Sequence, residues 1–412
     1  MLNFFKRKNK TENTNGFKYR LALDIGTEYL KAMIVEFNRD EKNIVGYGRI
    51  KQRYGDMTGG RISNIEGVIE TARQAVEVAK ENTPHEPTDA IVGIAGEFVK
   101  GAVTTLEIER KDPTEGITGK ELDTLINKAQ QLAFCKGKEE LIKLTGINNL
   151  EIERVNSALV EVKVDGYKVS NPYKFQGKNL AITLFNTYAP LANVGPLKTV
   201  VEDLGYSLAA TVAEPYAVAE SILTEEACEF GAIVVDIGGG TMDVALIRNG
   251  GIEGTEMVSI GGRSFTRKIA RESNATLKDA EELKIKYSND ELPADMKAEI
   301  ELMLAPDLNV LYESLELALK NLSKGSALPP RLYFCGGGSA LKGLVEGVKK
   351  KNIHERLPFF KDPEICLLRA EEITKINDPD NLVKGIGNVT PKALALGAAL
   401  HVSQDILEQK LA

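Results

Sequence analysis

Two aspartates followed by glycine-bearing turns are the residues of this sequence with the clearest chemistry. The stretch "LALDIGTEYLKAMIV" contains Asp24, and "IVVDIGGGTMDVAL" contains Asp236, each at the end of an apolar run and before a second one. Glycine lets main-chain N–H groups approach an anion closely. A neighbouring carboxylate suits Mg²⁺, which prefers oxygen ligands and usually keeps several waters. The repeated phrase therefore predicts two strand–turn–strand units that cradle phosphate and position Mg²⁺ through water.

Other side chains near these turns fit the same chemistry. Thr27 and Thr241 place hydroxyls where a phosphate oxygen or a metal-bound water would lie, and Lys31 follows the first turn, where an ammonium can contact β- and γ-phosphates. A later strand ending, "FCGGGSAL", offers a third close backbone approach and then a helix start. If the two units face each other, they clamp the phosphate tail of a nucleotide. The backbone contacts would come from Gly26, Gly238, Gly239, Gly240, Gly336, Gly337, Gly338 and Ser339.

Several classes of protein are excluded or disfavoured by pattern and composition. The chain lacks G-x-x-x-x-G-K-[ST], so it is not a P-loop enzyme, and its triple glycines do not fit the Rossmann pattern. The 4 cysteines and 3 histidines are scattered, which argues against a zinc site or a disulfide framework. A net charge of -7 argues against nucleic acid as a partner. No apolar run approaches the roughly 20 residues of a membrane span, so we expect a cytoplasmic protein.

The elements that must position these residues occur twice. "KYRLALDIG", "YLKAMIVEFN" and "KNIVGYGRIKQRYG" read as a β-meander, and "SNIEGVIETARQAVEVAKEN" has helical spacing. A second meander begins at "GAIVVDIGGG", and strands and helices alternate after both copies. The two aspartates are 212 residues apart, about half of the 412-residue chain. This spacing predicts a duplicated α/β domain.

At this point the sequence resembles the actin-like ATPase superfamily. "LDIGTEYLK" and "VVDIGGGTMDVA" are similar to its two phosphate motifs, "LYFCGGGSALKG" to its adenosine motif, and "AEPYAVAESIL" and "PKALALGAALH" to its connecting motifs. Within the superfamily the pattern resembles most the FtsA family of bacterial cell-division proteins, which the segments "GGRSFT" and "AEELK" also match. The resemblance implies a duplicated actin-like (ribonuclease H-like) fold with two lobes around a nucleotide cleft and an inserted 1C-type subdomain.

The resemblance also implies a division of the chain. We expect a flexible basic tail over residues 1–16 and the inserted subdomain 1C over residues 88–177, where the composition changes. Subdomain IA would comprise residues 17–87 and 178–212, and subdomain IIB residues 264–328. Subdomain IIA would then comprise residues 213–263 and 329–412, with the closing helix at its end.

Roles for individual residues follow from the same resemblance. Asp24 and Asp236 would hold Mg²⁺ through water beside ATP, and Asp236 or Glu214 would orient the attacking water. Glu214 is equally well explained as an acidic residue that begins a helix. Glu281 and Lys284 would contact adenosine or form a solvated helix face.

The implied function is that of an ATP-binding scaffold with slow hydrolysis. It would polymerise into filaments at the inner face of the cell membrane and tether the tubulin-like FtsZ ring through the FtsZ C-terminal peptide. The ending "SQDILEQKLA" departs from the basic amphipathic membrane helix usual in FtsA, so "MLNFFKRKNK", residues 1–10, is either a membrane anchor at the opposite end or a frayed tail. This departure leaves a PilM-like component of a type IV pilus platform as the alternative. A small-molecule kinase and an ATP-dead interaction protein also remain open.

Overall fold

A five-stranded sheet carries the first acidic turn. The computed structural model describes residues 16–96, 98–248 and 251–400. The strand order of this sheet is β11-β6-β1-β2-β3, with an antiparallel meander and two parallel strands. The bounds are β1 (Lys18–Ile25), β2 (Tyr29–Phe37), β3 (Lys42–Lys51), β6 (Asp89–Ile94) and β11 (Ser207–Ala213).

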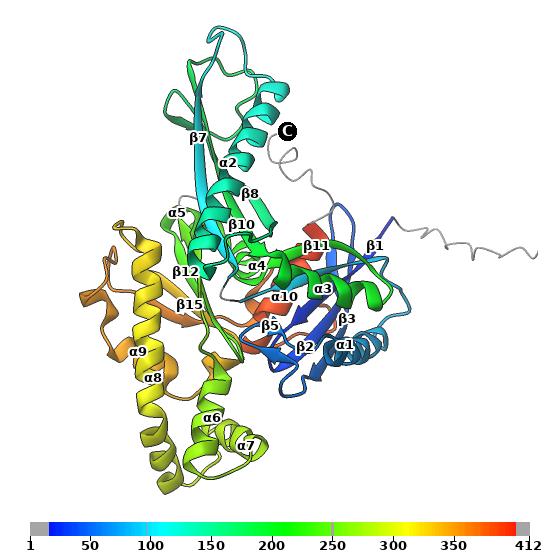
Figure 1. The fold of residues 1–412 in the computed structure, drawn as a ribbon, viewed down its shortest axis with the longest axis vertical. Coiled ribbons are helices and arrows are strands. Elements are labelled where there is room, and N and C mark those ends of the chain that lie inside the picture. Colours follow the sequence, from blue (N-terminus) through cyan, green and yellow to red (C-terminus); the bar gives the residue numbers. More distant parts are fainter. Residues whose placement is uncertain (1–15, 97, 249–250, 401–412) are drawn as a thin grey trace, which may run out of the picture.

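Helices bury both faces of this sheet. Leu21 and Leu23 of β1 pack in one core with α1, whereas Ala22 between them packs in a second core with α10. A strand that is covered on both sides reads as a continuous apolar run, as "LALDI" does. The covering helices are α1 (Ile65–Lys80), α3 (Leu191–Asp203), α4 (Glu214–Ser221) and α10 (Val389–Leu400) (Figure 1).

The second sheet repeats the topology of the first. Five neighbouring strands of this sheet follow the order β16-β15-β12-β13-β14, in which an antiparallel meander again lies beside two parallel strands. The predicted duplication is therefore present in the strand order itself. The bounds are β12 (Ala232–Ile237), β13 (Met242–Arg248), β14 (Gly251–Val258), β15 (Arg331–Cys335) and β16 (Glu364–Leu367).

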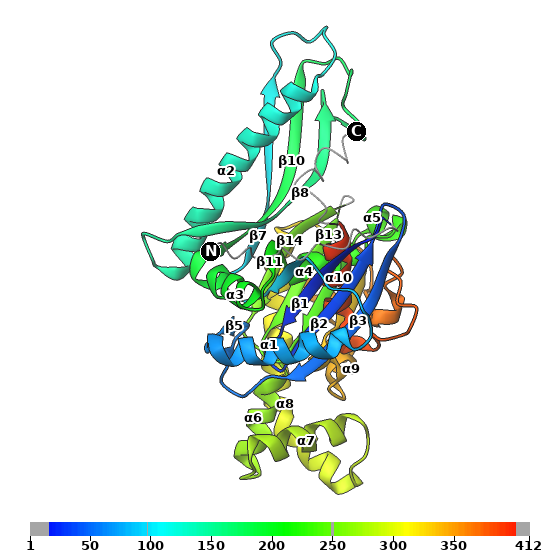
Figure 2. The same cartoon turned by 90° about the vertical axis from the view of Figure 1, so that its right-hand side faces the viewer.

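Four further strands extend the second sheet into a projecting unit. The join is short, with Gly254 opposite Ala102 and Thr255 opposite Gly101. Helix α2 packs its apolar side on these strands, which together stand away from the two lobes (Figure 2). The bounds are β7 (Lys100–Glu109), α2 (Gly119–Thr145), β8 (Ile152–Val164), β9 (Tyr167–Val169) and β10 (Asn179–Pro190).

Sheet pairing corrects the predicted limits of the inserted part. Strand β6 lies within residues 88–177, but it pairs with β1 and β11 in the first sheet. Strand β10 lies outside that range, yet it pairs with β7 and β8 of the projecting unit. Partners in a sheet are chosen across long sequence distances, so a change in composition does not locate such a boundary. The remaining division into subdomains stays a prediction.

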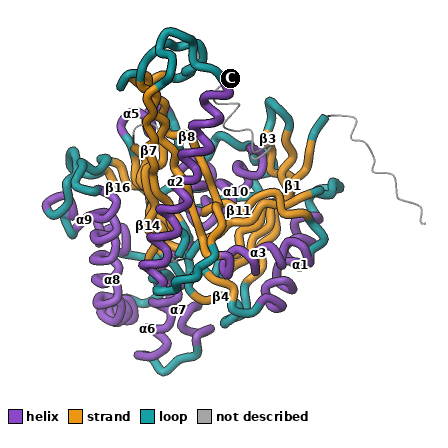
Figure 3. Tube along the Cα trace, turned by 45° about the horizontal axis from the view of Figure 1, so that its top comes forward, coloured by secondary structure: helices purple, strands orange, loops and turns teal. Residues whose placement is uncertain are grey.

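Helices flank the second sheet and extend below it. Helix α8 runs along one side of this sheet, while α1 and α3 lie beside the first sheet (Figure 3). Helix α8 contains Pro306 in its interior. The helices are α5 (Glu225–Phe230), α6 (Gly262–Glu272), α7 (Leu277–Ser288), α8 (Ala294–Ser323) and α9 (Leu344–Lys350).

Short elements complete the described chain. They are β4 (Met57–Thr58), β5 (Arg61–Ile62) and the 3₁₀ turns η1 (Gly337–Ala340), η2 (Ile353–Glu355), η3 (Ala370–Glu372) and η4 (Ile386–Asn388). The helix start predicted after the third glycine run is the 3₁₀ turn η1, and α9 follows it. Within the described ranges, no helix combines the length and apolar character that a membrane span needs. The predicted anchor at residues 1–10 and the ending "SQDILEQKLA" lie outside the described residues.

Candidate functional site

The two acidic turns meet between the lobes. A Cβ atom placed on Gly240 would lie 2.7 Å from Thr27 Oγ1, and one on Gly239 would lie 3.1 Å from Glu28 Cβ. Only residues without side chains allow the second turn to approach the first so closely. Asp24 and Asp236 consequently line one shared cleft, as the repeated phrase predicts.

This cleft has a volume of about 300 Å³ and walls from both lobes. Nearly every residue predicted for the site lines it, and only Ser339 does not. The Ser339 side chain is buried and donates its hydroxyl proton to the Cys335 carbonyl, so it stabilises the glycine turn. The lining residues that were predicted are Asp24, Gly26, Thr27, Lys31, Glu214, Asp236, Gly238, Gly239, Gly240, Thr241, Glu281, Lys284, Gly336, Gly337 and Gly338.

The floor of the cleft concentrates negative charge. Burial raises the pKa of Asp236, and the nearby Asp24 adds to this effect, although the Thr390 hydroxyl donates to Asp236 Oδ2 and opposes it. Burial and the charge of Asp236 hold the pKa of Asp243 well above its usual value. Burial raises the pKa of Glu214 strongly, and Asp24, Asp243 and Asp236 raise it further. A cation bound here would offset the cost of ionising these carboxylates.

Lys31 supplies one positive charge to this floor. Its Nζ lies 3.2 Å from Asp24 Oδ2 and donates to the Gly387 carbonyl at 2.7 Å. One ammonium does not balance several buried carboxylates, so the donor set fits a divalent cation beside a phosphate chain. Within the described residues, no group of three or more His, Cys, Asp or Glu side chains could hold a metal ion. The site for Mg²⁺ held through water therefore stays a prediction.

Glu214 begins α4 and also lines the cleft. A Cβ atom on Gly93 of β6 would lie 2.8 Å from Glu214 Oε1, so the glycine provides the space for this carboxyl group. The position suits both roles considered from the sequence, a helix-initiating acid and an acid that orients water. Asp243 accepts a hydrogen bond from Thr241 Oγ1 at 3.1 Å, which ties the side chains of the second turn together.

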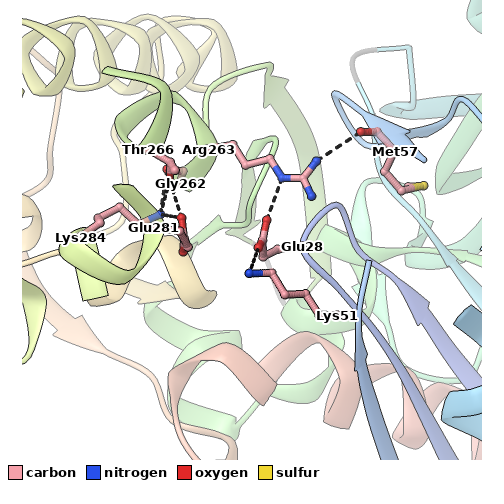
Figure 4. Close-up of polar contacts among 8 residues, drawn as sticks. All are labelled: Glu28, Lys51, Met57, Gly262, Arg263, Thr266, Glu281 and Lys284. Atoms are coloured by element: carbon pink, nitrogen blue, oxygen red, sulfur yellow. Dashed lines mark hydrogen bonds and ion pairs between the residues drawn. The ribbon is translucent and has the colours of Figure 1, made fainter. Parts of the chain in front are cut away.

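Glu281 and Lys284 form the wall of the cleft on α7 (Figure 4). Lys284 Nζ lies 2.8 Å from Glu281 Oε2 and donates to Thr266 Oγ1 at 2.8 Å and to the Gly262 carbonyl at 3.0 Å. Burial raises the pKa of Glu281, but Lys284 and the Thr266 hydroxyl outweigh burial, so the pKa lies below its usual value. The pair therefore belongs to a partly buried network that joins α6 to α7, and not to a solvated helix face.

A contact between the lobes was not predicted from the sequence. Arg263 Nε of α6 lies 2.7 Å from Glu28 Oε2 of the first turn, and Lys51 Nζ approaches the same carboxylate at 3.4 Å (Figure 4). The guanidinium also lies over the Tyr54 ring, 4.9 Å from its centroid. Arg263 belongs to the predicted "GGRSFT" motif, but no local pattern identifies its partner, which lies 235 positions away. Gly387 and Thr390, near the C-terminal end of the described chain, also line the cleft. Their place in the site was not predicted, for the same reason.

Comparison with known proteins agrees with the motifs. The family model described as "Cell division protein FtsA" matches residues 233–387. FtsA of Streptococcus pneumoniae is 23% identical over 94% of this chain and 88% of its own length. FtsA of Neisseria meningitidis is 27% identical over 66% of this chain, and the match spans 61% of that protein. FtsA of Bacillus subtilis is 22% identical over 85% of this chain and 82% of its own length.

A solved structure shares the whole fold. The PilM-PilN type IV pilus biogenesis complex contains a chain that superposes with a TM-score of 0.65, at 17% identity and over 95% of this chain and 98% of its own. At this identity the match bears on the fold alone. The superposition confirms the α/β, duplicated actin-like fold, and the sequence matches show that the chain is similar to FtsA proteins.

Proposed function

We propose that this FtsA-like chain binds ATP and Mg²⁺ in the cleft between its lobes and acts as a membrane-associated scaffold in cell division. One observation carries the nucleotide part of the proposal. Two glycine turns with buried aspartates touch each other at Thr27 and Gly240, and they line a single cleft with the third glycine run. Backbone N–H groups at such turns match the oxygens of a phosphate chain.

Each wall of the cleft has a part in this proposal. Asp24 and Asp236 hold waters of the cation, and Lys31, fixed by the Gly387 carbonyl, contacts the phosphates. Bound Mg²⁺ would neutralise part of the phosphate charge. Glu281 and Lys284 form the adenosine wall, where their shared hydrogen bonds with Thr266 keep α6 and α7 in register.

We propose that a carboxylate at the cleft floor orients the water for slow hydrolysis of ATP. Asp236 and Glu214 are the two candidates for orienting the attacking water, since both line the cleft. The raised pKa of each carboxyl group increases its affinity for a proton. Phosphoryl transfer also needs an aligned water. We therefore propose a nucleotide-dependent assembly protein with low turnover.

Assembly and tethering rest on the similarity to FtsA. The match to the Streptococcus pneumoniae protein covers most of both chains, which supports self-association into filaments and binding of an FtsZ-like C-terminal peptide. We propose peripheral attachment at the inner face of the cell membrane through residues 1–10. Co-sedimentation with liposomes, with and without ATP, tests this point by comparing the full chain with a chain that lacks residues 1–15. Equal binding of both chains refutes the N-terminal anchor.

A PilM-like role in a pilus platform is the second candidate. The superposition on the PilM-PilN structure shows a shared fold without assigning this role, whereas the matches to FtsA favour the division role. Binding assays with an FtsZ C-terminal peptide and with PilN separate the two. Phosphorylation of a sugar panel with labelled ATP tests the small-molecule kinase, and product above the hydrolysis background would support it.

The nucleotide proposal is tested by replacing one cleft aspartate. We expect Asp236→Ala to weaken binding of ATP with Mg²⁺ by at least tenfold in isothermal titration calorimetry. Asp380→Ala is the matched control, because Asp380 is exposed and lies outside the cleft. If Asp236→Ala binds ATP and assembles as the unchanged protein does, the chain is an ATP-independent interaction protein and the proposal fails.

A further inference from the structure

A second cavity adjoins the candidate cleft. It has a volume of about 360 Å³, and Thr27, Gly240 and Arg263 line both spaces. Its other walls come from the segment between β3 and α1 and from the start of α6. The contact between the two glycine turns therefore separates this cavity from the place proposed for the phosphates of the nucleotide.

The charge of this cavity is opposite to that of the cleft floor. Three arginines line it, Arg61, Arg263 and Arg267, and its lining contains no aspartate or glutamate. Side chains with hydroxyl groups also line it, namely Thr27, Tyr54, Thr58 and Ser259. The whole chain carries a net charge of -7, so this concentration of arginine differs from the average of the protein.

Two of these arginines have no acidic partner in the described structure. Arg263 pairs with Glu28, but no carboxylate among the described residues lies within 4.0 Å of a nitrogen of Arg61 or Arg267. Arg61 lies over the Phe98 ring at 5.7 Å, and Arg267 donates to the hydroxyl of Ser264 at 3.2 Å. Both side chains are exposed, so their guanidinium groups are accessible to a dissolved anion.

We propose that this cavity is an oxyanion site that binds inorganic phosphate. The planar guanidinium group presents paired N–H donors that match two phosphate oxygens. Arg61 and Arg267, which have no carboxylate partner among the described residues, supply the positive charge, and Arg263 adds donors beside them. The phosphate comes either from solution or from the neighbouring cleft after hydrolysis, and the second source rests on the proposed ATPase function. In that case Arg263, which lines both spaces, is the side chain that both ligands share.

The test measures phosphate binding by the full chain while nucleotide occupies the cleft. Inorganic phosphate is titrated calorimetrically at constant ionic strength, with and without ADP and Mg²⁺. We expect binding in both conditions and at least tenfold weaker binding in the double variant Arg61→Ala, Arg267→Ala. Lysine at both positions keeps the charge but loses the paired donors, so its affinity should be intermediate. The matched control is Arg53→Ala with Arg73→Ala, since these exposed arginines pair with Glu70 and Asp203 outside the cavity.

Several results would overturn the proposal. Unchanged phosphate affinity in the double alanine variant would do so, as would phosphate binding that ADP abolishes, which would place phosphate in the cleft only. Altered self-association without altered phosphate affinity would assign the arginines to an acidic side chain of a second copy. Thermal unfolding shows whether each variant is folded. If the double alanine variant is unfolded, the phosphate affinity of the double lysine variant is compared with that of the unchanged protein instead.

Two further measurements separate the sources of phosphate. A single-turnover assay with a phosphate sensor should show changed release in the double alanine variant if the cleft supplies the phosphate. If the double alanine variant releases phosphate at an unchanged rate but binds titrated phosphate more weakly, the phosphate comes from solution. Failure of the unchanged protein to bind ATP would refute the proposed function alone, because phosphate titration without nucleotide does not depend on it.

Discussion

Replacing Gly240 by alanine tests directly whether the contact between the two glycine turns creates the site. The new Cβ atom would lie 2.7 Å from Thr27 Oγ1 and 3.3 Å from Thr27 Cγ2. Thr27 is buried and branched at Cβ, so rotation of its side chain exchanges one close contact for another. The turns must move apart. Strain of this kind in a packed region costs about 1 to 3 kcal/mol.

The strain should appear mainly in nucleotide affinity. A loss of about 1.4 kcal/mol corresponds to a tenfold weaker equilibrium constant, so we expect Gly240→Ala to weaken ATP binding roughly 5- to 100-fold by calorimetry. Gly195→Ala is the control, because nothing lies within 4 Å of the added atom in α3. A double-mutant cycle with Thr27→Ala should give a coupling energy of about 1 kcal/mol, since that change removes both crowded atoms. ATP affinity within twofold of the unchanged protein would refute the reasoning.

Three further changes test the packing around the site and in the projecting unit. Gly336→Ala should lower the free energy of unfolding by at least 2 kcal/mol more than Gly343→Ala, as measured in urea, because both positions have a positive φ but only the first places a Cβ atom 2.0 Å from Asp236 Oδ1. Lys284→Met should weaken ATP binding by about tenfold, whereas the exposed Lys278→Met on the same helix should leave it unchanged. The hydrogen bond from Arg110 lowers the pKa of Glu121 below its ordinary value of 4.5, so this pair stabilises the fold above pH 4.5 and the contribution is lost as the pH falls below it. Glu121→Gln should therefore lower the free energy of unfolding, measured in urea, by about 1 to 2 kcal/mol at neutral pH. On acidification this variant should lose less of its remaining free energy of unfolding than the unchanged protein does.

The parts of the site that local chemistry determines were predictable. The phrase Asp-Ile-Gly between apolar runs identified both turns, because glycine and a terminal aspartate have few other reasons to recur in this setting. Glu281 and Lys284 line the cleft, and their partial burial excludes the solvated helix face that the sequence left open, while their contact with adenosine stays a prediction. A helix pattern shows which residues share a face, but it does not show that α6 covers that face.

Other features depend on contacts between distant segments and could not be read from the sequence. Arg263 and Glu28 lie on different lobes, and Thr390 reaches Asp236 from the closing helix. Helix α8 accommodates Pro306 in its interior, although proline normally kinks or ends a helix. Strand β6 was assigned to the inserted part because the composition changes at residue 88, but its pairing partners, which are distant in sequence, lie in the first sheet.

The distribution of charge across the contact between the turns connects these observations. On the cleft side, Asp24, Asp236 and Glu214 favour a cation, and the second cavity carries arginines without lining acids. Glu28 and Arg263 join the two regions through the ion pair between the lobes. A ligand that draws Arg263 away from Glu28 weakens the link between the lobes, while a cation that neutralises the cleft floor lowers the repulsion between the turns. Under the two proposals, Arg263 would couple the occupancy of the two spaces, because it lines both of them and forms the ion pair between the lobes.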